Sequence, residues 1–297
     1  MRVLITGTGG QLGGELLRAA PADVILAAPN RMDLDITDAA AVRHFCAEFR
    51  PDWIINAAGY TAVDRAESEP QQAYEANAGA VRNLAQAVDA HDARLLQIST
   101  DFVFDGAQGR PYRPDDIPNP LNAYAASKLE GERIASELLG SRALIVRTSW
   151  MYAAGGHNFV RTMLRLMQER DSLGVVADQV GTPTSARGLA EALWALLLAD
   201  EAGIHHWSDA GVASWYDFAL AIRDEASSLG LLDRVVPVTP LTTADYPTPA
   251  RRPSYSVLDK TATWAAMGHT APHWREALQR VLAQIADSYQ AAGQNSQ

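Results

Sequence analysis

The sequence predicts an α/β protein built on a parallel sheet, and three observations lead to this fold class. Short apolar runs rich in β-branched residues alternate with helical patterns over the first 150 positions, which is typical of βαβ units. A glycine-rich turn, "TGTGGQLG", follows the first apolar run. After residue 150 the alternation loosens. Together these patterns indicate a Rossmann-type, doubly wound parallel sheet with a smaller C-terminal lobe.

Each element of the first part has a signal of its own. Strands are expected at the apolar runs 2–7, 23–30, 52–59, 94–100 and 142–150. Helices are expected at the amphipathic runs 10–20, 38–49 and 70–91, and a further helix opens near Tyr124. Pro21 is expected to end the first helix, because proline cannot continue one.

The region after residue 150 is less regular. Helices are predicted at 159–171 and 185–200, and "GIHHWSD" (203–209) has a strand pattern. From residue 242 onward, prolines are expected to break any regular pattern. The predicted division is a dinucleotide-binding domain over 1–150, to which 180–210 returns, a substrate-binding lobe over 151–179 and 211–290, and a polar tail over 291–297.

Composition limits the partners and the compartment. A net charge of −10 argues against non-specific binding to nucleic acid, whose phosphates need basic patches. No apolar run approaches the ~20 residues that span a membrane, and the N-terminus enters a strand with no signal region. The single cysteine, Cys46, excludes an internal disulfide, which fits a cytoplasmic protein. The seven histidines show no metal-ligand spacing, so no metal site is predicted, and His205 and His206 are expected at a strand edge.

The glycine turn predicts a dinucleotide site. Gly7, Gly10 and Gly13 form a G-x-x-G-x-x-G pattern between a strand and a helix. Glycine permits the tight turn and a close backbone approach to a pyrophosphate, and the helix N-terminus beyond it favours an anion.

The end of the second strand bears on the choice of cofactor. Sheets that bind NAD usually carry an acid there, which bonds the ribose 2′-hydroxyl. This chain has Asn30 and Arg31 instead. Without the carboxylate there is no repulsion against a 2′-phosphate, and Arg31 can pair with one. NADPH is therefore favoured over NADH, although use of NADH stays open.

A proton-transfer group is predicted from three residues. Tyr124 and Lys128 lie four apart, so they share one face of a helix. Thr100 ends the fourth strand, and ligands of open α/β sheets bind outside such strand ends. A nearby ammonium stabilises a phenolate, so we expect Lys128 to lower the pKa of Tyr124 and Thr100 to bond the substrate oxygen.

Several motifs together resemble a known family. "TGTGGQLG", "NAAGYTAVDRAE", "STDFVFDG" and "YAASK" are similar to the extended short-chain dehydrogenases/reductases that act on nucleotide sugars. "RTSWMY", "NFVRTML", "DQVGTPT" and "YPTPARRPSYSVLD" resemble the branch of that family that reduces dTDP-4-dehydro-L-rhamnose at C4 to dTDP-L-rhamnose. The resemblance covers nearly the whole chain.

The resemblance implies a role for individual residues. Tyr124 delivers the proton, Lys128 holds the nicotinamide ribose, and Thr100 bonds the reacting oxygen. The implied cofactor contacts are Gly10, Gln11 and Leu12 at the pyrophosphate, Asp35 and Ile36 at the adenine, and Gly59, Tyr60 and Thr61 toward the nicotinamide. Gly7, Asn30 and Arg31 join them from the glycine turn and the end of the second strand. The implied sugar contacts are Asp101 and Trp150, with Asn158 and Arg252 as weaker candidates for the nucleotide end. The family also pairs in some members through Mg²⁺-linked carboxylates, so a homodimer and Mg²⁺ are possibilities that no motif here locates.

Two alternatives stay open. One is another nucleotide-sugar enzyme on the same scaffold, an epimerase or a 4,6-dehydratase, although Phe102 stands where a dehydratase has a second acid after Asp101. The other is a non-catalytic, dinucleotide-binding regulatory subunit of the methionine adenosyltransferase type. The intact set of Thr100, Tyr124 and Lys128 argues against that second alternative.

Overall fold

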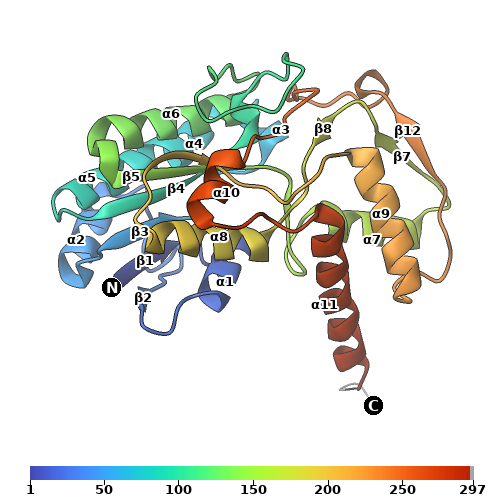
Figure 1. The fold of residues 1–297 in the computed structure, drawn as a ribbon, viewed down its shortest axis with the longest axis horizontal. Helices are drawn as coiled ribbons and strands as arrows, with labels where there is room; N and C mark the ends of the chain where they lie inside the picture. The colour runs from blue at the N-terminus through green and yellow to red at the C-terminus, as the bar shows by residue number, and fades with distance from the viewer. Residues whose placement is uncertain (295–297) are drawn as a thin grey trace.

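The computed structural model describes residues 1–294 and divides into a sheet-centred part and a smaller lobe beside it (Figure 1). Six parallel strands form the central sheet in the order β10-β5-β4-β3-β1-β2. They are β1 (Arg2–Thr6), β2 (Ile25–Ala27), β3 (Trp53–Asn56), β4 (Arg94–Thr100), β5 (Ala143–Thr148) and β10 (Gly203–His206). The chain reverses its direction of winding after β2, and such a point in a doubly wound sheet is where ligands bind.

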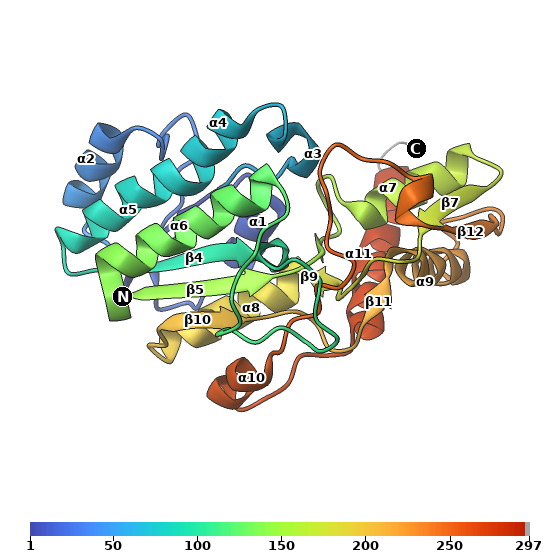
Figure 2. The same ribbon diagram turned by 90° about the horizontal axis from the view of Figure 1, so that it is seen from above.

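Helices cover both faces of this sheet (Figures 1 and 2). One face carries α1 (Gln11–Arg18) and α8 (Ala186–Leu198), and the other carries α2 (Ala39–Phe49), α5 (Ala80–Asp89) and α6 (Ala123–Leu139). Strand residues alternate between the two cores: Val3 and Ile5 pack toward α1 and α8, whereas Leu4 packs toward α2 and α5. This alternation follows from the two-residue period of a strand, and it explains why the strands are apolar throughout. The predicted fold class is confirmed.

The smaller lobe has its own hydrophobic core, formed mainly by three helices. These are α7 (Phe159–Glu169), α9 (Trp215–Ser228) and α11 (Trp274–Gln294). Outside the central sheet, the described residues form three two-stranded sheets. They pair β7 (Leu173–Val176) with β12 (Val238–Leu241), β8 (Val180–Gly181) with β11 (Ala213–Ser214), and β6 (Met151–Tyr152) with β9 (Thr184–Ser185). The remaining elements are α3 (Val63–Ala66), α4 (Pro70–Tyr74), α10 (Thr261–Met267) and the turns η1 (Glu75–Gly79), η2 (Asp101–Val103), η3 (Gly140–Arg142) and η4 (Thr243–Asp245).

The structure corrects three of the predicted elements. The strand predicted at 23–30 is reduced to β2, because Pro29 has no N–H to donate and Asn30 begins a turn. The helix predicted at 70–91 is interrupted by η1, a π-helical turn. The expectation that prolines break regular structure after residue 242 is wrong for α10 and α11. α10 lies between Pro253 and Pro272, and α11 begins after Pro272, so neither helix contains a proline.

The segment predicted to return to the sheet supplies α8 and β10, and β10 pairs with the edge of β5. His205 and His206 therefore lie in an edge strand, as predicted. The functional division into two domains stays a prediction. α11 runs on to Gln294, so the predicted polar tail starts inside this helix, and 295–297 lie outside the described residues. Within residues 1–294 no helix has both the length and the apolar character needed to cross a bilayer.

Candidate active site

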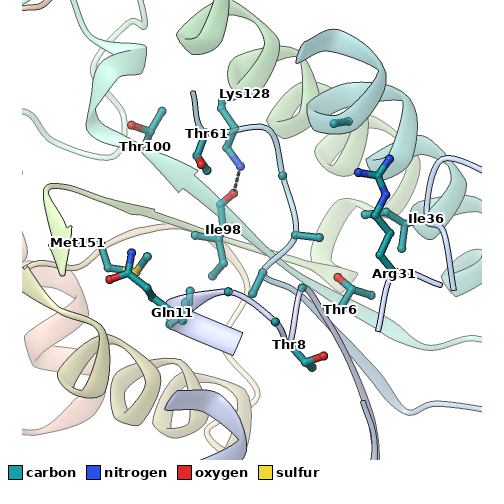
Figure 3. A pocket seen from close by; sticks show the side chains of 18 of the residues that line it. Thr6, Thr8, Gln11, Arg31, Ile36, Thr61, Ile98, Thr100, Lys128 and Met151 are labelled. Carbon is teal, nitrogen blue, oxygen red and sulfur yellow. Dashed lines mark hydrogen bonds between the residues drawn. The ribbon is translucent and has the colours of Figure 1, made fainter. Parts of the chain in front are cut away.

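A cavity of about 740 Å³ opens at the carboxyl ends of the central strands. The last residues of β1, β4 and β5, namely Thr6, Thr100 and Thr148, all line it. Figure 3 shows Arg31 and Ile36 toward one end and Thr100 with Lys128 toward the other, with Thr6, Thr8 and Gln11 along the floor. Its size lies within the range of small-molecule and cofactor sites.

The glycine turn forms the floor of the cavity, and at two of its positions the neighbouring backbone leaves no room for a side chain. Gly7 has a φ of +75°, and a Cβ atom on it would lie 2.5 Å from the backbone nitrogen of Ala58. A Cβ atom on Gly13 would lie 2.2 Å from the carbonyl oxygen of Gly7. Gly10 is the N-cap of α1 and has no side chain to accept from the first turn. The N–H groups at the start of α1 are thus available to an anion.

Buried polar side chains tie the strand ends together beneath the cavity. Thr6 Oγ1 donates to Asn56 Oδ1 at 2.6 Å, and Asn56 Nδ2 donates to Gln97 Oε1 at 2.7 Å. Gln97 Nε2 then donates to the carbonyl oxygen of Ile98 at 2.8 Å. This chain crosses β1, β3 and β4, so it fixes the three strand ends relative to one another.

Lys128 reaches into the cavity from α6. Its Nζ donates to the carbonyl oxygen of Ile98 at 2.6 Å, on the same oxygen that Gln97 bonds (Figure 3). Tyr124 lies one turn earlier on α6 and also lines the cavity. Thr100 comes from the end of β4 and lines the same cavity. The three residues predicted as a proton-transfer group therefore line one cavity.

The pKa values differ from the expectation for Tyr124. Burial raises the pKa of Tyr124 to about 12, the nearby hydroxyl of Thr100 works against this, and Asp101 raises it further. Burial lowers the pKa of Lys128 to about 8, and Glu132 opposes that shift. The prediction that Lys128 lowers the pKa of Tyr124 is wrong for the protein without its ligands. The ammonium group of Lys128 is directed at Ile98, and the burial of the phenol is the largest effect on its pKa. At neutral pH Tyr124 therefore holds its proton.

Polar atoms without a partner point to a ligand with hydrogen-bonding groups. Among the residues that the structure describes, Ser99 Oγ, Asp101 Oδ2 and Thr148 Oγ1 are buried, make no hydrogen bond and belong to residues that line the cavity. Burial raises the pKa of Asp101 to about 7, although Ser256 and Thr100 bond this carboxyl group. Unpaired buried groups cost free energy, and such groups are concentrated at functional sites.

The adenosine end predicted from the sequence is also in the cavity wall. Asn30, Arg31, Asp35 and Ile36 all line it. The Arg31 side chain is 85% exposed, and its one ionic contact, Nε to Asp35 Oδ2, is 3.8 Å long. Asp35 Oδ1 accepts from both the backbone N–H and the hydroxyl of Thr37, and these bonds lower its pKa. Arg31 is therefore free to turn toward an anionic group.

The segment Gly59–Thr61 is held by a residue that sequence reasoning missed. Asn77, in the π-helical turn η1, accepts from the backbone N–H of Tyr60 at 2.8 Å and donates to its carbonyl oxygen at 3.0 Å. Asn77 Nδ2 also donates to Ser127 Oγ on α6 at 2.9 Å. Gly59 and Thr61 line the cavity, but Tyr60 does not, because its hydroxyl donates to Glu69 at 2.7 Å. A π-turn within a helix often marks a functional site.

Two weaker candidates lie away from the cavity lining. Asn158 caps α7 through Arg161 N–H and donates to Gln11 Oε1 at 2.7 Å, so it contacts the glycine turn rather than a ligand. Arg252 pairs with both carboxylate oxygens of Asp64 at 3.0 and 2.8 Å. Trp150 does line the cavity, together with Gln11, Leu12 and Gly10.

Some lining residues had no clear signal in the sequence. They are Thr8, Ala57, Ala58, Ser99, Thr148, Ser149, Met151, Gly156 and His157. Most lie at the end of a strand or just after it, so their position at the end of a buried apolar run could have found them. Gly156 and His157 come from the loop before α7 and are placed by tertiary structure alone. Within residues 1–294 no cluster of three or more His, Cys, Asp or Glu is arranged to hold a metal.

Known proteins resemble this chain along nearly its whole length. Residues 1–287 match the family described as "RmlD substrate binding domain". A dTDP-4-dehydrorhamnose reductase from Aggregatibacter actinomycetemcomitans is 43% identical over 95% of this chain and 98% of its own. The solved structure of a dTDP-4-dehydrorhamnose reductase from Clostridium acetobutylicum has a TM-score of 0.90 at 40% identity, covering 96% of this chain and 99% of its own. That from Bacillus anthracis, solved in complex with NADP, has a TM-score of 0.89 at 38% identity, covering 95% and 99%.

These matches confirm the predicted family and the prediction of an NAD(P)H-dependent oxidoreductase. The chain belongs to the RmlD family, the dTDP-4-dehydrorhamnose reductases of the extended short-chain dehydrogenase/reductase type.

Proposed function

We propose that this protein reduces dTDP-4-dehydro-β-L-rhamnose at C4 to dTDP-β-L-rhamnose, using NADPH. The observation that carries the proposal is the convergence of Thr100, Tyr124 and Lys128 in a cavity whose floor is the glycine turn. The names of its relatives support the substrate, because several full-length relatives at 38–45% identity are dTDP-4-dehydrorhamnose reductases.

The residues present fit a dinucleotide. The side-chain-free floor at Gly7 and Gly10 and the uncapped start of α1 suit a pyrophosphate. The exposed guanidinium of Arg31 suits a 2′-phosphate, and the relative from Bacillus anthracis was solved with NADP. The bound nicotinamide would supply the hydride. NADH as a second cofactor and Mg²⁺ remain predictions without a site.

Tyr124 is the proposed proton donor. Its raised pKa keeps the phenol protonated at neutral pH, so it has a proton to give to the oxygen that develops at C4. Thr100 lines the same cavity, and its hydroxyl would donate to the same oxygen. Lys128 is anchored on the carbonyl oxygen of Ile98 in the same cavity, where it would hold the nicotinamide ribose.

The sugar would be recognised beside this group. Asp101 offers a buried carboxyl group with one unpaired oxygen, and Trp150 offers a flat apolar surface. Phe102 follows Asp101, so the acidic pair of a 4,6-dehydratase is incomplete here. The retained proton-transfer group argues against a purely regulatory subunit. A homodimer and a cytoplasmic location stay predictions.

The test is a substrate panel. The protein is incubated with NADPH and, separately, with dTDP-, UDP- and GDP-linked 4-keto-6-deoxy sugars, while absorbance of the reduced cofactor is followed. Oxidation of NADPH with dTDP-4-dehydro-L-rhamnose, one equivalent per sugar reduced, is expected. Absence of NADPH oxidation with every sugar, or tightly retained NAD⁺ with epimerisation of the sugar, would refute the proposal.

A further inference from the structure

Trp150 occupies an unusual position between the sheet and the smaller lobe. It follows the end of β5, yet its backbone has a φ of +45°, which non-glycine residues seldom adopt. Two hydrogen bonds tie this segment to residues 182–184. Ser149 Oγ donates to the carbonyl oxygen of Thr182 at 2.7 Å, and the N–H of Thr184 donates to the carbonyl oxygen of Trp150 at 3.2 Å. A strained residue persists only where its surroundings fix it, and such residues are concentrated at functional sites.

The Trp150 indole lies in a narrow slot. The indole of Trp215 stacks on it, with ring centroids 3.6 Å apart and planes 8° from parallel. On Gly181, a Cβ atom would lie 2.7 Å from Trp150 Cε2 and 2.9 Å from Cζ2 and Nε1. Any side chain at position 181 would therefore displace the indole. We call the space bounded by Gly181 and Trp215, which the Trp150 indole fills, the indole slot.

Both residues of the slot come from the smaller lobe and are fixed by regular structure. β8 pairs antiparallel with β11, and this pairing sets Gly181 opposite Ala213. Trp215 is the first residue of α9, two positions after Ala213. A capping box holds that start, because Ser214 Oγ accepts from Asp217 N–H at 3.0 Å and Asp217 Oδ2 accepts from Ser214 N–H at 2.9 Å. The slot is thus rigid, whereas the indole that fills it comes from the end of the sheet.

We propose that Gly181 and Trp215 are positioning residues for the nucleotide sugar. They hold the Trp150 indole in place, and the indole contacts the sugar. Neither residue lines the cavity, whereas Trp150 does. An indole has only two rotatable side-chain bonds, so stacking on Trp215 and the close approach of Gly181 restrict where it can lie at the cavity wall. The inference rests on the proposed function, in which the sugar lies against Trp150. Cofactor contacts at the glycine turn and Arg31 do not depend on the slot.

Gly181→Ala tests the inference directly. The added methyl group moves the indole, so KM for dTDP-4-dehydro-L-rhamnose should rise about tenfold, equal to about 1.4 kcal/mol, while KM for NADPH stays within twofold. Gly174→Ala is the matched control, because its Cβ would lie 2.7 Å from Leu241 Cδ1 in the same lobe, away from the indole. Gly109→Ala, whose Cβ meets nothing within 4 Å, controls for the substitution itself. Both controls should keep the wild-type KM for the sugar.

Trp215 gives a second, spectroscopic measurement. Two indoles stacked this closely produce an exciton signal in circular dichroism, which Trp215→Leu should abolish together with the tight KM for the sugar. Trp215→Phe keeps a flat ring and should recover most of the affinity. Suppose that the wild-type protein reduces the sugar, but Gly181→Ala leaves the KM for the sugar unchanged or Gly174→Ala raises that KM equally. The inference about the indole slot is then wrong, whereas the proposed function stands. Wild-type protein that reduces none of the nucleotide sugars would overturn the proposed function as well.

Discussion

The buried ion pair behind the candidate site allows a prediction with a magnitude. Arg147 is 1% and Glu132 3% exposed. Arg147 Nε donates to Glu132 Oε1 at 2.9 Å, and Nη2 donates to Oε2 at 2.7 Å. Arg147 Nη1 also donates to the carbonyl oxygen of Pro114 at 3.2 Å. Arg147→Met leaves the carboxylate buried without its partner, which costs about 3–5 kcal/mol of the free energy of unfolding.

Urea denaturation at neutral pH measures this loss. The exposed pair of Arg165 and Glu169, with 59% and 52% of the side chains accessible and the same 2.7 Å contact, provides the control. Arg165→Met should cost less than about 1 kcal/mol. The double variant Arg147→Met/Glu132→Leu should recover most of the stability, because no lone charge remains buried. A loss below about 1 kcal/mol for Arg147→Met, or no recovery in the double variant, would refute the reasoning.

The double variant has a second consequence at Lys128. Glu132 lies four residues after Lys128 on α6 and raises the pKa of its ammonium group against the effect of burial. Removing that carboxylate should lower the pKa of Lys128 further. The alkaline fall in kcat/KM of the double variant is therefore expected at a lower pH than in the wild type, even where the stability is restored.

Three further predictions concern other charged groups. The pKa of Lys128 is lowered to about 8, so its charge is present below that pH and lost above it; kcat/KM should fall above about pH 8, and a flat profile to pH 10 would contradict its role. Arg31→Ala should lower the kcat/KM ratio of NADPH to NADH about tenfold, whereas an unchanged ratio would exclude a 2′-phosphate contact. Burial raises the pKa of Asp209 to about 7, so the folded chain keeps a proton that the unfolded chain releases, and stability falls as pH rises from about 4 to 7. Asp209→Asn should therefore melt above the wild type at pH 8 and close to it at pH 4, and a lower Tm than the wild type at pH 8 would contradict this.

Much of the sheet could be predicted because its signals are local. β4 begins and ends where the apolar run "RLLQIST" does, and α2 begins beside its capping Asp38. Other features depend on distant residues. Pattern reading treats 70–91 as one helix, since nothing local shows that Asn77 must bond Tyr60 and Ser127 across a π-turn.

The candidate site shows the same limit. Spacing alone placed Tyr124 and Lys128 on one face, and the cavity contains both. Spacing could not show that Lys128 is bonded to Ile98, or that burial outweighs its charge at Tyr124. The buried pair of Arg147 and Glu132 was also out of reach, because its members come from β5 and α6 and meet only in the folded chain.

Tyr124→Phe is the most direct test of the central claim that the phenol of Tyr124 donates the proton. Phenylalanine keeps the edge-on contact with Phe102, whose ring centroid lies 6.3 Å away, and removes only the hydroxyl. With saturating NADPH and dTDP-4-dehydro-L-rhamnose, kcat should fall by about 10²–10⁴, while the affinity for NADPH changes little. A variant that keeps kcat within about threefold of the wild type would show that another group supplies the proton.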